Sequence, residues 1–163
     1  MSRVYFIEDT TIGTMARPRG GDWLLDDLSA LKRMGLDVLV CLMEGEELQE
    51  LDLQEEAKAC QNMGIEFIHF PISDFGLPAD ESAAQKLVLQ LKALVEEGKK
   101  VAAHCRMGIG RSSTIAAATL IALGNHTTKT AFEGIQKARG LRVPDTEQQI
   151  EWVERFEKRW YQS

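Results

Sequence analysis

The sequence has no long hydrophobic run and nothing that resembles a secretion signal. Its longest apolar stretch, IAAATLIAL at residues 115–123, is well short of the roughly 20 residues that a membrane-crossing helix needs. We therefore expect a soluble, cytoplasmic protein that does not act at a membrane.

Cysteine is scarce, with three residues in 163. Cys41, Cys60 and Cys105 form no CxxC pair and have no Cys/His spacing, which disfavours both a disulfide framework and a zinc site. We expect reduced thiols, no metal and no cofactor. A redox partner for Cys105 would need a Cα atom within about 7 Å, so the roles of the other two thiols stay open at this stage.

Positive charge is in deficit, because 19 Lys and Arg face 25 Asp and Glu, for a net charge of −6. Such a chain repels polyanions on average, which disfavours nucleic acid and anionic lipid as partners. Any anion must be bound at a local site. No repeat or linker divides the chain, so we expect residues 1–163 to form a single domain that is a monomer.

Strand and helix patterns alternate along the chain. Apolar residues at helical spacing follow Asp22 and Asp80, each placed to cap a helix, and Gly35 and Gly98 are placed to end these two helices. Strands are expected at 4–7, 11–16, 37–42, 65–72 and 100–105, and three C-terminal helices at 111–123, 128–138 and 146–160.

This order predicts an α/β fold with a mostly parallel central sheet of about five strands, flanked by helices, and a helical C-terminal cluster. Parallel strands end at one edge of a sheet. The loops after Leu42, Ile72 and Cys105 should therefore meet there, where sites of such folds lie.

The stretch HCRMGIGRSS at 104–113 connects a strand to a helix. Gly108 and Gly110 allow a tight loop whose backbone N–H groups can point inward, at the positive end of the helix that begins near Arg111. The arginine fork matches two oxygens of a phosphate. The same dipoles and charge favour the thiolate form of Cys105, so the stretch indicates a nucleophile beneath a phosphate.

HCRMGIGRS also resembles the signature H-C-x5-R-S/T of the cysteine-dependent protein tyrosine phosphatases. The resemblance implies a phosphatase-like fold. The resemblance implies that Cys105 is the nucleophile, that Arg111 binds the phosphoryl group, that Ser112 assists departure of the thiolate and that His104 supports the loop. The implied phosphate-binding residues are Arg106, Met107, Gly108, Ile109, Gly110 and Arg111.

Two further segments complete the predicted site. Asp74 in PISDFGLP follows a strand that ends at the same edge, so it is our choice of general acid, whereas Asp80 is better explained as a helix cap. PDTEQQIEW at 144–152 resembles the stretch in which kinase-associated phosphatases carry a water-positioning glutamine. Gln149 is the first choice for this role and Gln148 the second. The alternative is that both are simply exposed residues of a helix.

Chain length and motif order resemble the compact dual-specificity branch, nearest the kinase-associated type. This implies one metal-independent catalytic domain that hydrolyses phosphotyrosine, and phosphoserine or phosphothreonine as further substrates, in a phosphorylated protein or peptide. Met107 and Ile109 stand where inositide phosphatases carry basic residues. The alternatives are a phosphoprotein-binding module with little turnover and a phosphatase of a non-protein ester such as a phosphoinositide. A sulfurtransferase or arsenate reductase would not need Asp74.

Two charged stretches remain. EGEEL at 44–48 is expected to be a solvated loop, although it could face basic residues of a peptide. ARPRG at 16–20 is expected to face solvent, with a second phosphate as the alternative.

Overall fold

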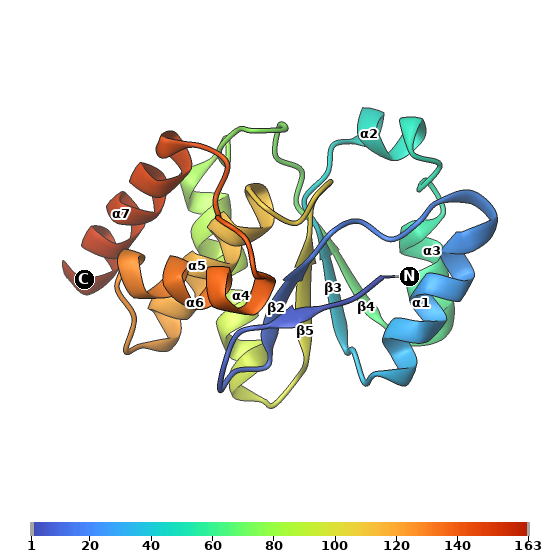
Figure 1. The fold of residues 1–163 in the computed structure, drawn as a ribbon, viewed down its shortest axis with the longest axis horizontal. Helices are drawn as coiled ribbons and strands as arrows, with labels where there is room; N and C mark the ends of the chain where they lie inside the picture. Colours follow the sequence, from blue (N-terminus) through green and yellow to red (C-terminus); the bar gives the residue numbers. More distant parts are fainter. Residues whose placement is uncertain (1, 163) are drawn as a thin grey trace.

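A mixed five-stranded sheet lies at the centre of the protein (Figure 1). The computed structural model describes residues 2–162. The strand order is β1-β2-β5-β3-β4, in which only the edge strand β1 is antiparallel to its neighbour. The strands are β1 (Tyr5–Phe6), β2 (Ile12–Met15), β3 (Val38–Cys41), β4 (Glu66–His69) and β5 (Val101–His104). The predicted mostly parallel sheet is confirmed.

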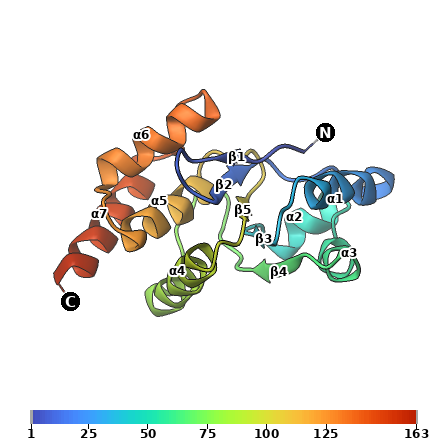
Figure 2. The same ribbon diagram turned by 90° about the horizontal axis from the view of Figure 1, so that it is seen from below.

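Helices cover both faces of this sheet. They are η1 (Gly21–Trp23), α1 (Leu24–Arg33), α2 (Gly45–Glu50), α3 (Glu56–Met63), α4 (Glu81–Glu96), α5 (Arg111–Leu123), α6 (Thr128–Arg139) and α7 (Glu147–Gln162). Two views show α1 and α3 on one side of the sheet and α4 to α7 on the other, with the two ends of the chain far apart (Figures 1 and 2). None of the helices within residues 2–162 is long and apolar enough to cross a bilayer.

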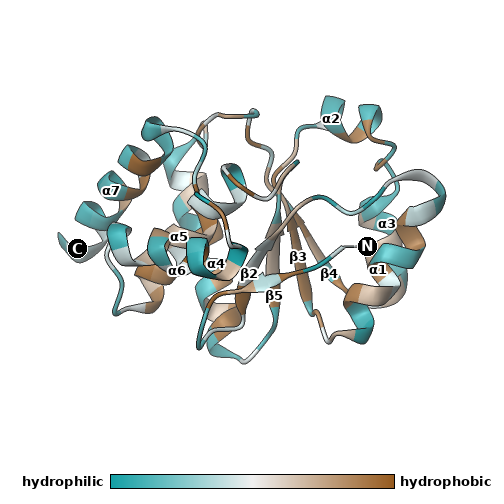
Figure 3. Ribbon diagram, in the orientation of Figure 1, coloured by the Kyte–Doolittle hydropathy of each residue, from teal (hydrophilic) through white to brown (hydrophobic). Residues whose placement is uncertain are grey.

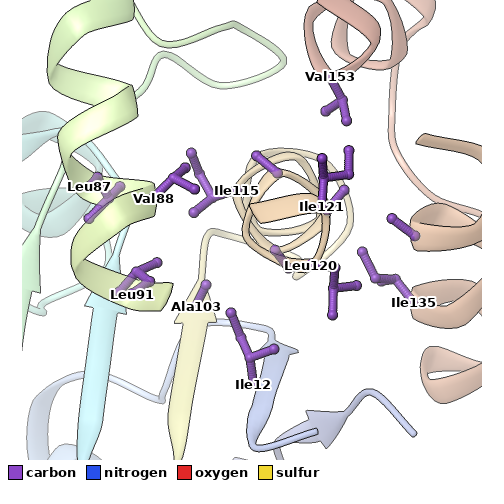
Figure 4. Close-up of a cluster of buried hydrophobic side chains, with 14 of the residues drawn as sticks. Ile12, Leu87, Val88, Leu91, Ala103, Ile115, Leu120, Ile121, Ile135 and Val153 are labelled. Atoms are coloured by element: carbon purple, nitrogen blue, oxygen red, sulfur yellow. The ribbon is translucent and has the colours of Figure 1, made fainter. Parts of the chain in front are cut away.

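Alternation along the strands divides the core into two layers. In β5, Val101 and Ala103 pack toward α4 and α5, whereas Ala102 packs toward α1 and α3. Helix α5 is buried along nearly its whole length, and its many alanines allow neighbouring helices to approach closely. Figure 4 shows α5 between α4, α6, α7 and the sheet, and the hydropathy colouring shows apolar strands beneath mostly polar outer helix faces (Figure 3).

Most predicted helix ends are correct. The Asp80 carboxylate accepts a hydrogen bond from the Ala83 N–H at 3.1 Å, which confirms the cap of α4. Gly35 and Gly98 follow their helices with φ of 91° and 85°, a conformation that glycine adopts without steric cost. The predicted Asp22 cap is wrong, because Asp22 lies within η1 and the chain enters α1 through this 3₁₀ turn, without a side-chain cap.

The expectation of a solvated loop at 44–48 is also wrong. Gly45–Glu50 form helix α2, and the Glu44 N–H donates to Glu47 Oε2 at 2.9 Å, as in a capping box. Glu47 is buried, whereas Glu44 and Glu46 are exposed. Short acidic stretches are usually solvated, but here a buried cation lies beneath the helix.

Candidate active site

The segment between β5 and α5 curls into a tight loop at the carboxyl edge of the sheet. Gly108 has φ of 73°, and a Cβ there would lie 2.6 Å from the Met15 carbonyl carbon, so only glycine fits. Cys105 lies at the base of the loop, 3% exposed. Its Sγ is 3.3 Å from Ser112 Oγ, so thiol and hydroxyl form one hydrogen-bonded pair.

Arg111 is the buried cation at the start of α5. Its Nη1 donates to Glu47 Oε2 at 2.7 Å and to the Ile72 carbonyl at 2.9 Å. Its Nη2 donates to Glu47 Oε1 at 2.9 Å and to Asp74 Oδ1 at 3.0 Å. Within residues 2–162 the Nε–H has no partner. Two guanidinium donors, Nε and the Nη2 proton now held by Asp74, can therefore turn to an incoming phosphate.

Burial and charge oppose each other in this pair. Desolvation is the largest single effect and raises the pKa of Glu47, but the hydrogen bonds from Arg111 and from the Glu44 N–H, together with the charge of Arg111, outweigh it and lower the pKa below the usual range. Desolvation likewise disfavours charge on Arg111, and Glu47 reverses that effect and raises the arginine pKa. Both groups therefore stay charged, and the pair holds the guanidinium of Arg111 in a fixed orientation.

Asp74 lies on the loop between β4 and α4 at the expected edge. Besides Arg111, its Oδ1 accepts a hydrogen bond from the Phe75 N–H at 3.1 Å, and Phe75 has a left-handed φ of 59°. Left-handed backbone is uncommon for an aromatic residue. The side chain of Phe75 is 62% exposed, so the turn presents a carboxylate inward and a ring outward.

The backbone donors of the loop residues from Arg106 to Gly110 are unpaired. No backbone N–H of residues 106–110 has a hydrogen-bond partner elsewhere in residues 2–162. The carbonyls are held from behind, because Arg139 donates to Met107 O at 2.9 Å and to Gly108 O at 3.1 Å. Arg106 forms an ion pair with Glu50 at 3.2 Å. Unpaired backbone amides beside a guanidinium are suited to bind an anion.

This geometry agrees with comparisons with known proteins. The family model described as a polymorphic toxin system DSP-PTPase phosphatase matches residues 13–125. The chain belongs to this DSP-PTPase family. A curated relative, cyclin-dependent kinase inhibitor 3 of Rattus norvegicus, is 29% identical over 132 residues, which are 80% of this chain and 61% of that protein. The chain thus spans about three fifths of the length of the curated relatives it matches.

Solved structures show the same fold. Kinase associated phosphatase (KAP), crystallised with its catalytic site cysteine replaced by serine, superposes with a TM-score of 0.84 at 23% identity, over 93% of this chain and 88% of that one. Tk-PTP in its active form has a TM-score of 0.78 at 27% identity, over 96% and 97% of the two chains. The resemblance to the dual-specificity branch is confirmed, and kinase-associated phosphatase is among the structures that share the fold.

The start of α7 also borders the candidate site. Gln149 is fully buried; its Oε1 accepts from the N–H groups of Asp145 and Thr146 at 3.0 and 3.2 Å, and its Nε2 donates to the Gly76 carbonyl at 3.2 Å. A Cβ on Gly110 would lie 3.0 Å from this Nε2. Gln148 is exposed, so Gln149 is the glutamine at the loop, and its role stays a prediction.

Asp145 is a site residue that the sequence analysis missed. A Cβ on Gly110 would overlap its Oδ2, so the carboxylate rests against the loop. Partial burial, and then the nearby charge of Asp74, raise the pKa of Asp145 above its usual range. The available signal was its place in the same PDTEQQ stretch as Gln149.

His104 supports the loop from beneath, with a partner that the sequence analysis also missed. Its Nε2 lies 2.6 Å from Glu56 Oε2, and its Nδ1 lies 3.2 Å from the Cys105 carbonyl oxygen. Burial alone lowers the pKa of His104, but the charge of Glu56 and contact with Cys41 raise it well above its usual value. The imidazolium can then donate to both neighbours.

Cys41, Glu56 and His104 have ligand atoms within 4.8 Å of one another. Two ligands on one tetrahedral zinc, each at about 2.0 Å, lie about 3.3 Å apart. The 2.6 Å between His104 and Glu56 is therefore the distance of a hydrogen bond rather than of a shared metal. The three side chains are therefore arranged for a proton shared between His104 and Glu56 rather than for a zinc ion.

Neither remaining thiol faces Cys105. Cys41 pairs in register with His104, and both Cys41 and Cys60 pack in the layer beneath α1 and α3, whereas Cys105 packs in the opposite layer. Burial, and then the charges of Glu56 and Cys41, raise the pKa of Cys60 to about 12. The sheet therefore separates both thiols from Cys105, and neither is placed to be its redox partner.

Proposed function

We propose that the protein is a metal-independent phosphoprotein phosphatase that acts through a phosphocysteine. One observation carries the proposal: the guanidinium of Arg111 hydrogen bonds to Asp74 at the mouth of the loop that holds Cys105 and Ser112. Nucleophile, phosphate-binding cation and acid therefore share one small site, which is what phosphoryl transfer requires.

In the first step, the Cys105 thiolate attacks phosphorus while the inward amides of residues 106–110 and Arg111 stabilise the equatorial oxygens. The phosphate replaces Asp74 on Arg111, which frees that carboxyl group. Protonated Asp74 then gives its proton to the departing phenolic or alkoxide oxygen. The S–P bond forms, the P–O bond breaks, and the dephosphorylated side chain leaves neutral.

In the second step, water attacks the phosphocysteine. Ionised Asp74 takes a proton from the water, the S–P bond breaks, and the Ser112 hydroxyl donates to the departing Cys105 thiolate. Gln149 is our choice for orienting the water, because its Nε2 lies beside Gly110 and bears a second N–H. Inorganic phosphate is the product, and no metal or cofactor takes part.

The rim favours a peptide. Met107 and Phe75 are both 62% exposed and offer apolar contacts to a phosphotyrosine ring and its neighbours. Glu44, Glu50 and Asp145 add negative charge around them, which disfavours an anionic membrane. KAP is by name a kinase-associated phosphatase. The proposed substrate is therefore phosphotyrosine in a protein, with phosphoserine or phosphothreonine as further substrates.

The proposal extends to the whole chain. We infer one catalytic domain over residues 1–163 that acts as a cytoplasmic monomer without nucleic acid or membrane partners. The net charge of −6 supports the absence of polyanionic partners.

Phosphate release from phosphotyrosine and phosphoserine peptides, measured with a chelator present, tests the proposal. We expect turnover that Cys105→Ser lowers on the order of 10³-fold or more and that Cys60→Ser, a buried thiol on the other side of the sheet, leaves intact. Activity that survives in Cys105→Ser would refute the covalent mechanism. Tight phosphopeptide binding without any release would instead assign the protein as a binding module.

A further inference from the structure

A separate cavity lies at the end of the sheet opposite the candidate active site. It has a volume of about 790 Å³ and is bordered by the turn between β1 and β2, by the end of α5 with the turn that follows it, and by single residues of α4 and α6. Figure 1 shows the turn between β1 and β2 and the loop between β5 and α5 at opposite ends of the strands. A volume of this size is typical of small-molecule sites.

The inner wall of this cavity is apolar. Ile7 and Leu120 line it and are 2% and 1% exposed, and the lining residues Val95 and Leu123 are half-buried. Ile7 and Leu120 belong to the larger core cluster, and Val95 packs against it. The wall therefore offers an apolar ligand the same kind of surface that the core offers to its own side chains.

A glycine in the middle of a helix keeps this cavity open. Gly134 lies within α6 and lines the cavity. A Cβ built on it would lie 3.4 Å from Ile7 Cγ2, which is an ordinary contact distance. Neither an unusual backbone nor close packing therefore requires glycine here, although glycine disfavours a helix interior relative to alanine. What the missing side chain provides is space, because a longer side chain at this position would extend into the cavity.

The rim of the cavity has an excess of negative charge. Glu8 and Asp9 line it, whereas no Lys or Arg does. Lys137 forms an ion pair with Glu8 at 2.9 Å, and the exposed Asp9 carboxylate has no ion pair within residues 2–162. Asp9 is therefore available to a positively charged group of a ligand.

We propose that this cavity binds a small organic cation, with an apolar body against Ile7, Leu120 and Leu123 and an amine group at the Asp9 carboxylate. The ammonium group can donate charge-assisted hydrogen bonds to Asp9, and its charge complements the negative rim. The same rim disfavours carboxylate and phosphate ligands. The inference is independent of the proposed phosphatase function, because no residue of the candidate active site lines the cavity.

Three probes that carry a phenyl ring on a short alkyl chain test the proposal: phenylbutylamine, phenylbutanol and phenylbutyrate, which differ chiefly in the charge of the end group. Binding is followed by the backbone amide shifts of the isotope-labelled protein. We expect the amine to shift amides of residues 7–11 and 123–126 and to bind about tenfold more tightly than the alcohol, which is the gain from one charge-assisted contact. The acid should bind most weakly. Excess inorganic phosphate should not displace the amine.

Two positions locate the contacts. Asp9→Asn should lower the affinity for the amine about tenfold, to that of the alcohol. Asp52→Asn is the matched control, because Asp52 is likewise exposed with a left-handed φ, 56° against 63° at Asp9, but does not line the cavity; it should leave binding unchanged. Gly134→Leu should abolish binding of the amine and the alcohol. Gly134→Ala adds one methyl group, so it should raise the midpoint of thermal unfolding and retain binding.

The outcomes separate this proposal from the proposed function. Equal affinities for the amine and the alcohol in the parent protein would refute recognition of a cation, and no amide shift with any probe would refute the cavity as a binding site. Shifts confined to residues 104–112, or amine binding that survives unaltered in both Asp9→Asn and Gly134→Leu, would place the amine elsewhere and overturn the proposal. Failure to release phosphate from phosphopeptides would instead refute the phosphatase function and leave the cavity unaffected.

Discussion

Glu47 holds Arg111 through two parallel hydrogen bonds of 2.7 and 2.9 Å, one to each terminal nitrogen of the guanidinium. The two residues lie 64 positions apart, and both are buried. This fork sets the plane of the guanidinium and leaves Nε and the Nη2 proton that Asp74 now accepts as the donors available to a ligand. We therefore infer that Glu47 positions Arg111 for phosphate binding.

The first prediction concerns this pair. Glu47→Gln should raise the inhibition constant of inorganic phosphate and lower kcat/KM by about 100-fold, with a loss of about 3 kcal/mol in stability because a buried guanidinium loses its charged partner. Glu46→Gln, an exposed neighbour on α2, should change neither quantity. Phosphate affinity that is unaltered in Glu47→Gln would contradict the positioning role.

The second prediction concerns the acid. Asp74→Asn should slow turnover of phosphotyrosine peptides about 10²- to 10³-fold, and much less for an aryl phosphate with a strongly acidic leaving phenol, which departs without a proton. Phosphate binding should persist. Asp80→Asn is the control: asparagine also caps helices, so the cap of α4 should persist and the rate should not change. An equal loss for both leaving groups would move the acid elsewhere.

The third prediction separates the two glutamines. Gln149→Ala should slow hydrolysis of the phosphocysteine more than its formation, so a burst of phenol release should precede a slow steady state. Gln148→Ala, at an exposed position, should behave like the parent protein. Gln149 also ties the start of α7 to Gly76. If that tie were its only role, both steps would slow together and no burst would appear.

The fourth prediction uses the buried His104–Glu56 pair. Because the pKa of His104 is raised in the folded state, the folded protein holds a proton that the unfolded chain releases near pH 6.5. This stabilisation is fully present below that pH and is lost as pH rises toward the folded-state pKa, by at most about 1.4 kcal/mol per pH unit.

Glu56→Gln removes the charge that raises the pKa of His104 most, while burial, which favours the neutral ring, remains, so the loss of stability with rising pH should be smaller than in the parent protein. Urea unfolding between pH 6.0 and 8.5 measures the two slopes. Glu55→Gln, at an exposed position beside α3, should retain the slope of the parent protein. Parallel curves for the parent protein and Glu56→Gln would show that His104 does not carry the proton.

Residues that lie close together in the chain could be identified before the structure. The Cys105–Arg111 spacing, the helix at Arg111–Leu123 and the cap at Asp80 each depend on contacts within a few positions, which a local pattern records. The prediction of an Asp22 cap failed under the same rule, because a 3₁₀ turn that begins at Gly21 determined how the chain enters α1.

The sequence by itself therefore determined the candidate nucleophile, the candidate anion loop and a carboxylate at the expected edge of the sheet. Tertiary structure alone decided which acidic residues matter. Glu47, Glu56 and Asp145 resemble the many solvated carboxylates of an acidic chain. The burial of Glu47 and Glu56 depends on how distant elements such as β5 and β3 come together, and the position of Asp145 against Gly110 depends on the packing of α7 near the loop. Such long-range contacts arise only when the whole fold forms, because the free energy of a buried charge depends on the partner that meets it there.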